Sequence, residues 1–157
     1  MTSVVSLRTF ANCSSGPIVV PVDMQQEHLA KPRLPAISAI DCDSYRNEMR
    51  FERSSPSCYS SKPFAALVNQ SRGGIVRVGF AGESACPSAL IDAFHRNHKV
   101  TYLSDASASH ALDDMPADDV HRAVSRISGL YGDVYETPDW IASTLSRKLG
   151  YGKNAGG

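Results

Sequence analysis

The sequence predicts an α/β fold with a mostly parallel sheet, and residues 73–110 carry the main support for this prediction. Residues 75–80 form a short apolar run typical of a buried strand. Residues 87–95 place Leu90, Ile91 and Phe94 at helical spacing, and residues 100–103 are again β-prone. Strand, helix and strand within about 30 residues indicate a βαβ unit, whose crossover requires a parallel sheet.

The other elements are predicted on both sides of this unit. Strands are expected at residues 17–22 and 133–136, helices at 62–70, 116–131 and 137–150, and loops at 27–43, 46–61 and 106–115. The 157 residues predict one domain at 17–150, between a flexible leader at 1–16 and a flexible tail at 151–157. The leader lacks the apolar core of a signal peptide.

Composition argues against several classes of function. Lys plus Arg and Asp plus Glu both number 16, so no net charge attracts the chain to nucleic acid or to an acidic membrane. No apolar run approaches the roughly 18 residues of a membrane-spanning helix. The four cysteines form no CxxC pair, and the five histidines form no metal-binding motif. We therefore expect a cytoplasmic protein with reduced thiols, no metal and no cofactor.

The loop at residues 81–86 is where a βαβ unit carries its chemistry. It follows the carboxyl end of a strand and precedes a helix, where open parallel sheets bind their ligands. Pro87 fits the first helical position, because a proline there gives up an N–H that has no partner anyway. Cys86 would then lie at the positive end of the helix dipole, which favours a reactive thiolate. A half-buried, inert thiol is the alternative.

Three segments resemble the isochorismatase-like hydrolases, also called the cysteine hydrolase family. They are IVVPVDMQQ with Asp23, FERSSPSCYSS with Arg53, and GFAGESACPSALIDAFHRNHKV with Cys86. Together they cover most of the chain from Ile18 to Trp140. The resemblance implies a Rossmann-like three-layer sandwich. Because the segment between Asp23 and Arg53 is shorter than in the family, the sheet is expected to lack one or two strands.

The resemblance also implies roles for the two charged residues. In that family an Asp at the end of the first strand is the base, a Lys stabilises charge, and a Cys at the helix N-terminus is the nucleophile. The Asp corresponds to Asp23. The Lys position falls on Arg53, which keeps the positive charge but is effectively never neutral, so it cannot serve as a proton donor.

The nucleophile position allows two readings. Aligned without a gap, the family's Cys falls on Ala85, and Cys86 is one residue late, a turn of about 100° on a helix. If the loop shifts, Cys86 attacks a carbonyl or amide carbon, and N–H groups near Ala81 and Ala85 hold the oxyanion. If Ala85 occupies the site, the chain resembles the isochorismatases proper, in which the Asp protonates a vinyl ether that water then cleaves. The resemblance further implies a cis peptide bond between Phe80 and Ala81.

Three functions follow from these observations. The first is a hydrolase acting on a small amide or vinyl ether in a pocket lined by Tyr59, Phe80, Ser107 and His110. The second is a catalytically weakened relative that serves as a binding or assembly subunit. The third, a Rossmann-type nucleotide binder, has little support because the loop contains no GxGxxG motif. A shortened sheet would leave apolar surface uncovered, so we expect a homo-oligomer. The only other binding partner that we expect is a small-molecule substrate.

Overall fold

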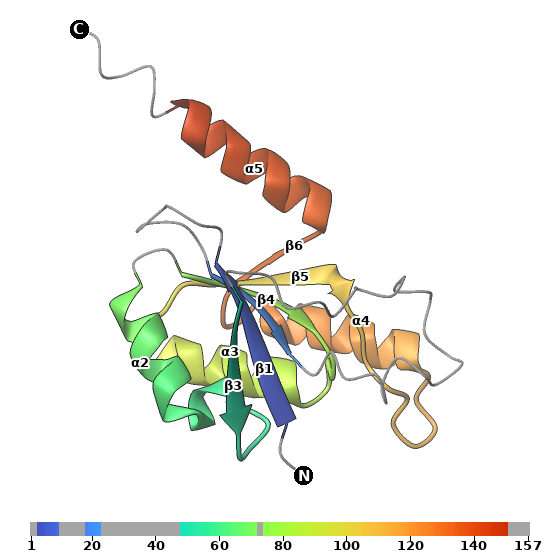
Figure 1. Ribbon diagram of the computed structural model, residues 1–157. Helices are drawn as coiled ribbons and strands as arrows, with labels where there is room; N and C mark the ends of the chain where they lie inside the picture. Colours follow the sequence, from blue (N-terminus) through green and yellow to red (C-terminus); the bar gives the residue numbers. More distant parts are fainter. Residues whose placement is uncertain (1–2, 10–17, 23–47, 72–73, 151–157) are drawn as a thin grey trace, which may run out of the picture.

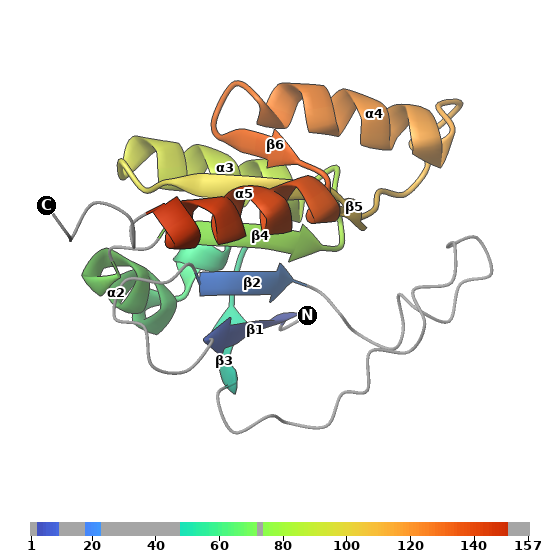
Figure 2. The same ribbon diagram turned by 90° about the horizontal axis from the view of Figure 1, so that it is seen from above.

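The computed structural model describes residues 3–9, 18–22, 48–71 and 74–150. Its strands form one six-stranded sheet in the order β3-β1-β2-β4-β5-β6, which Figure 2 shows from above. Strand β1 is antiparallel to both β2 and β3, whereas β2, β4, β5 and β6 run parallel. The strands are β1 (Ser3–Thr9), β2 (Ile18–Val22), β3 (Glu48–Arg53), β4 (Ile75–Gly79), β5 (Val100–Ser107) and β6 (Asp133–Tyr135).

Helices lie on both faces of the sheet, so the α/β fold is confirmed. In Figure 1, α2, α3 and α4 lie together on one face, and α5 projects from the other. None of the helices in the described residues is long and apolar enough to cross a membrane. The helices are α2 (Lys62–Gln70), α3 (Ala85–His95), α4 (Ala117–Ser128) and α5 (Thr137–Gly150), and a 3₁₀ turn, η1, spans Cys58–Ser60.

The main core lies between the sheet and the layer formed by α2, α3 and α4. Helix α3 faces this core with Leu90 and with small residues, which let the helix lie close to the strands. The small residues are Ala85, Cys86, Ala89 and Ala93. From the sheet, Ile18, Val20, Ile75 and Tyr102 face the same core. Because β4 is paired on both sides, its sequence is nearly all apolar, as expected for a buried parallel strand. Arg77 is the exception.

The N-terminal part of the sheet differs from the prediction. Residues 3–9, predicted to lie in a flexible leader, form β1 between β2 and β3. Residues 48–53, predicted as part of a polar loop, form β3. Both are held by antiparallel pairing rather than by a local apolar pattern, and such pairing leaves little trace in a single sequence. The loop predicted at 27–43 and the tail at 151–157 lie outside the described residues.

Several apolar side chains that were predicted to face the core are exposed instead. They are Phe94, Ala123, Ile127, Ile141 and Leu145. The helices themselves lie close to where they were predicted, and Val120 and Val124 of α4 are buried as expected. Helical spacing predicts which residues share a face, but the depth of each is decided by packing. In α3, the alanines contact the core and leave Phe94 outside.

Candidate functional site

The loops that follow β4 and β5 are bonded to each other at the carboxyl edge of the sheet. The Gly82 N–H donates to the Ala108 carbonyl at 2.8 Å, and the Ala108 N–H donates to the Gly79 carbonyl at 3.4 Å. The fit is close, because a Cβ on Gly82 would lie 2.2 Å from Ser109 Oγ. Only glycine fits there without a shift, and the two loops are therefore held as one unit.

The cis peptide bond expected between Phe80 and Ala81 is present at the start of this unit. Phe80 is buried, and its ring centroid lies 5.4 Å from that of His110. Ser107 is buried as well and pairs in register with Gly79. Three of the four predicted pocket residues, Phe80, Ser107 and His110, therefore gather at this edge.

Tyr59, the fourth predicted pocket residue, lies elsewhere. Its hydroxyl is 2.8 Å from His98 Nδ1, and the Arg96 guanidinium lies over its ring, 5.1 Å from the centroid. Both partners follow the C-terminal end of α3, whereas the loop at 80–84 precedes its N-terminal end. Tyr59 also packs edge-on against Phe64 in the core, so the structure does not bring it together with the other three predicted pocket residues.

Helix α3 begins two residues earlier than predicted. Ser84 is its N-cap and Ala85 its first residue, which puts Pro87 in the third position. The Ala81 carbonyl accepts the N–H groups of Ser84, Ala85 and Cys86 at 3.3, 3.0 and 3.3 Å. The Ala85 N–H, proposed above as an oxyanion donor, is thus bonded within the loop, and an anion would have to displace that bond.

The Cys86 side chain belongs to the core. Its exposed fraction is 0%, and it packs in the cluster that joins α3 to the sheet. Its proximity contributes to the raised pKa of Tyr102, although burial is the larger cause. Ala85 is buried beside it. A thiol in this position does not face a substrate bound at the carboxyl edge of the sheet. This favours the reading in which Cys86 is not the nucleophile.

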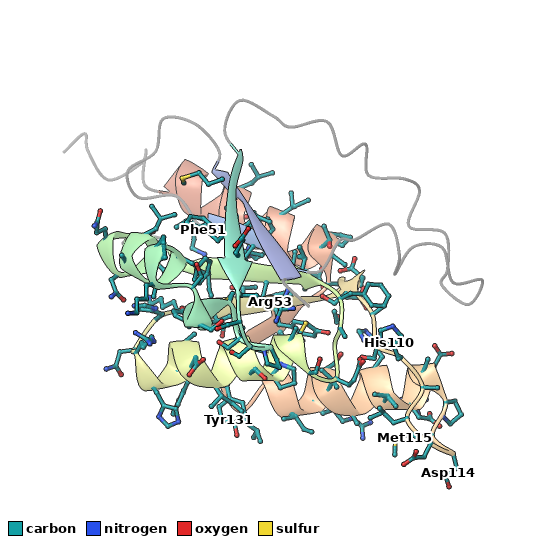
Figure 3. The ribbon with its side chains drawn as sticks, turned by 60° about the horizontal axis from the view of Figure 1, so that its bottom comes forward. Phe51, Arg53, His110, Asp114, Met115 and Tyr131 are labelled. Carbon is teal, nitrogen blue, oxygen red and sulfur yellow. The ribbon has the colours of Figure 1, made fainter. Side chains whose placement is uncertain are left out.

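Arg53 ends β3, a strand with the same direction as β2, so it lies at the carboxyl edge of the sheet (Figure 3). Its side chain is buried, and Nη1 donates to the Ser55 carbonyl at 2.8 Å and to the Pro56 carbonyl. The guanidinium is thereby anchored to the turn that follows its own strand. Arg53 provides a fixed positive charge rather than a mobile one.

A second buried cation, Arg77, was not predicted as a site residue. Its exposed fraction is 0%, and it lies near Cys58 and Tyr102. Burial raises the pKa of the Cys58 thiol to about 11, although Arg77 and Arg53 favour the thiolate. The signal in the sequence was a charged residue inside the apolar run of β4.

Glu83 is the other site residue that sequence reasoning missed. Its Oε1 oxygen lies 2.8 Å from His110 Nδ1, and its Oε2 oxygen accepts the His110 backbone N–H at 3.1 Å. The pair joins the loop after β4 to the segment after β5, which Figure 3 shows leading from His110 to Asp114 and Met115. Nothing in the local sequence pattern connects two residues so far apart.

Asp23 lies outside the described residues. The residue before it, Val22, pairs in register with Gly79, directly before the Phe80–Ala81 bond. In the part of the chain that the structure describes, no three His, Cys, Asp or Glu side chains gather closely enough to bind a metal ion.

Comparison with solved structures identifies the fold. A protein assigned as an isochorismatase from Burkholderia xenovorans LB400 is similar, with a TM-score of 0.54 and 22% identity. The alignment covers 60% of this chain and 48% of that one. The chain has the fold of the isochorismatase-like hydrolases. No protein-family model and no curated protein matches the sequence.

Two further structures agree with the isochorismatase-like fold. A cysteine hydrolase from Pseudomonas syringae pv. phaseolicola 1448A has a TM-score of 0.50 and 26% identity, over 57% of this chain and 45% of that one. A protein assigned as an isochorismatase hydrolase from Oleispira antarctica has a TM-score of 0.51 and 21% identity, over 57% and 51%. The chain thus spans about half the length of the structures it matches.

Proposed function

We propose that the protein is a hydrolase that adds water directly to a small substrate, with a vinyl ether preferred over an amide. The observation that carries the proposal is the complete burial of Cys86 in the core, within a loop and helix of isochorismatase-like fold. A buried thiol cannot form a covalent intermediate with a substrate on the rim, whereas cleavage of a vinyl ether needs only a proton and a water.

Asp23 is the proposed proton donor, and the fixed charge of Arg53 is proposed to orient an anionic group of the substrate. Val22 and Arg53 both end strands that point to this edge of the sheet, which supports the two roles. Arginine suits the recognition of a carboxylate, because its planar N–H groups match the two oxygens.

The test is hydrolysis of a panel of small vinyl ethers and amides by the purified chain. We expect Asp23→Asn to abolish cleavage, at least 100-fold, and Cys86→Ala to retain most of it. Loss of activity in Cys86→Ala, with the fold preserved by circular dichroism, would instead support a thiol nucleophile. If the wild-type chain cleaves neither class, the remaining candidate is a binding or assembly subunit. The anchored Arg53 and the buried Cys86 are consistent with that role.

A further inference from the structure

Glu83 and His110 form a carboxylate–imidazole pair that the mechanism above does not use. Glu83 Oε1 lies 2.8 Å from His110 Nδ1, and the exposed fractions of the two side chains are 14% and 34%. The carboxylate is therefore mostly buried, while the imidazole still reaches the surface. This combination allows the ring to meet a substrate while its partner stays fixed.

The hydrogen bonds to Glu83 determine which nitrogen of the neutral His110 imidazole carries the proton. Both oxygens of Glu83 are used, one by His110 Nδ1 and the other by the His110 backbone N–H. An ionised carboxylate only accepts hydrogen bonds, so Nδ1 is the donor. In the neutral ring, the basic nitrogen is then Nε2. Glutamine would replace Glu83 only in part, because its amide has an NH2 donor in place of one of the two accepting oxygens.

The pair stands at the same edge as the candidate site. Glu83 belongs to the loop between Phe80 and α3, and the Phe80 ring lies 5.4 Å from the His110 ring. The hydrogen bond from the Gly82 N–H to the Ala108 carbonyl joins the two loops next to this pair. In parallel sheets, the carboxyl edge is where ligands bind, so the imidazole is placed for chemistry and not only for packing.

We propose that His110 is the acid–base residue of this site and that Glu83 is its positioning residue. The inference rests on the proposed function and supplies the group that activates water in place of a thiol. Once Asp23 has protonated the terminal carbon of the vinyl ether, water adds to the resulting oxocarbenium carbon. His110 Nε2 takes one proton from that water, and the imidazolium charge is balanced by Glu83.

The remaining steps return every proton. The imidazolium gives its proton to the ether oxygen as the carbon–oxygen bond of the hemiketal breaks, which releases an alcohol. The Asp23 carboxylate takes the hydroxyl proton of the other product, which becomes a ketone. The enzyme is restored, and the net change is one vinyl ether and one water to one ketone and one alcohol. No oxidant or co-reactant is needed.

The test uses p-nitrophenyl acetate, whose hydrolysis reports a basic or nucleophilic imidazole without requiring the natural substrate. We expect His110→Ala to lower the protein-dependent rate at least tenfold and Glu83→Gln to lower it about threefold. His95→Gln is the matched control, because His95 is exposed on α3 and should leave the rate unchanged. After subtraction of the rate that imidazole gives without protein, added imidazole should restore part of the His110→Ala rate, an effect that a purely structural histidine would not show.

A second measurement, nitrogen-15 NMR of the imidazoles, tests the pair itself. We expect the neutral His110 ring to carry its proton on Nδ1 in the wild type and to lose this preference in Glu83→Ala. The inference is overturned if His110→Ala hydrolyses p-nitrophenyl acetate as fast as the wild type, or if the His110 proton lies on Nε2. Either result stands apart from the proposed function, whose failure would show as a wild type active on the acetate ester but inactive on vinyl ethers and amides.

Discussion

Arg77 of β4 and Tyr102 of β5 lie opposite each other in register, and the polar ends of both are buried without full hydrogen bonding. Arg77 Nη1 donates to the Val78 carbonyl, but Nε and Nη2 have no hydrogen-bond partner among the described residues. The Tyr102 hydroxyl lies near the Ser107 and Ser125 hydroxyls but makes no well-formed hydrogen bond among the described residues. A buried charge with unused donors is costly, so this pair is a weak point in the core.

Arg77→Met should therefore stabilise the protein. Methionine has a similar length and no charge, so it keeps the packing and removes the desolvation penalty. We expect the free energy of unfolding in urea to rise by about 1–4 kcal/mol.

The matched control is Arg122→Met, since Arg122 is exposed and pairs with Asp119 at 2.6 Å on the surface of α4. That change should alter the free energy of unfolding by less than about 1 kcal/mol. A large loss of stability in Arg77→Met would contradict the prediction and would mean that the guanidinium has a buried acceptor in solution.

Cys58 should make the protein less stable in alkali. Burial raises the pKa of its thiol from 9.0 to about 11, so above pH 9 the unfolded chain loses a proton that the folded chain retains. The stability contribution is complete below pH 9 and is lost as the pH rises through 11. The expected loss is about 2–3 kcal/mol.

Urea denaturation at pH 8 and at pH 10.5 measures this effect. Cys58→Ala should be less stable at pH 8, because it leaves a cavity, but should lose less stability between the two pH values. Some alkaline loss should persist, because burial also raises the pKa values of Tyr59 and Tyr102. An equal pH dependence in both proteins would show that Cys58 is accessible to solvent.

The sequence predicts the centre of the fold well. Strand β4, helix α3 and strand β5 each carry a local pattern, namely an apolar run, a helical period and a β-branched segment. The edge of the sheet is not predictable in this way. Strands β1 and β3 form because each pairs with the other, so the local sequence of neither strand is sufficient to predict it.

The same contrast holds for the candidate site. Phe80, Ser107 and His110 were predictable because parallel strands bring their carboxyl ends to one edge. Tyr59 lies apart from them, beside Arg96 and His98, because the sequence alone does not show which end of a helix a preceding turn will contact. The partnership of Glu83 with His110 is a long-range contact, and without a fold there is no reason to connect them.

Gly82→Ala should loosen the two loops that carry the site. The added Cβ would lie 2.2 Å from Ser109 Oγ and 2.9 Å from the Ala108 carbonyl oxygen. We expect a loss of roughly 1–3 kcal/mol in the free energy of unfolding, typical of overpacking. Adding Ser109→Ala should recover part of that loss by removing the nearer atom. Gly129→Ala is the matched control, since its Cβ would come no closer than 3.3 Å to the Arg126 carbonyl oxygen.

Asp105 should be the main attachment of α5 at its N-terminus. Its Oδ1 oxygen accepts the Thr137 backbone N–H at 2.8 Å and the Thr137 hydroxyl at 2.7 Å. Such a bond satisfies one of the first N–H groups of a helix, which have no partner within it. Asp105→Ala should cost about 1 kcal/mol and Thr137→Ala less, because alanine at 137 keeps the backbone donor.

Trp140 offers a direct readout of this attachment. It is the one tryptophan of the chain and lies half-buried in α5, so its fluorescence reports whether the helix stays on the sheet. In Asp105→Ala we expect its emission to shift to longer wavelength at a lower urea concentration than the loss of far-ultraviolet circular dichroism. Asp114→Ala, an exposed carboxylate on the turn after His110, should leave both transitions unchanged. If Asp105→Ala also leaves the emission unchanged, α5 is held by its other contacts with β5, and the two hydrogen bonds contribute little.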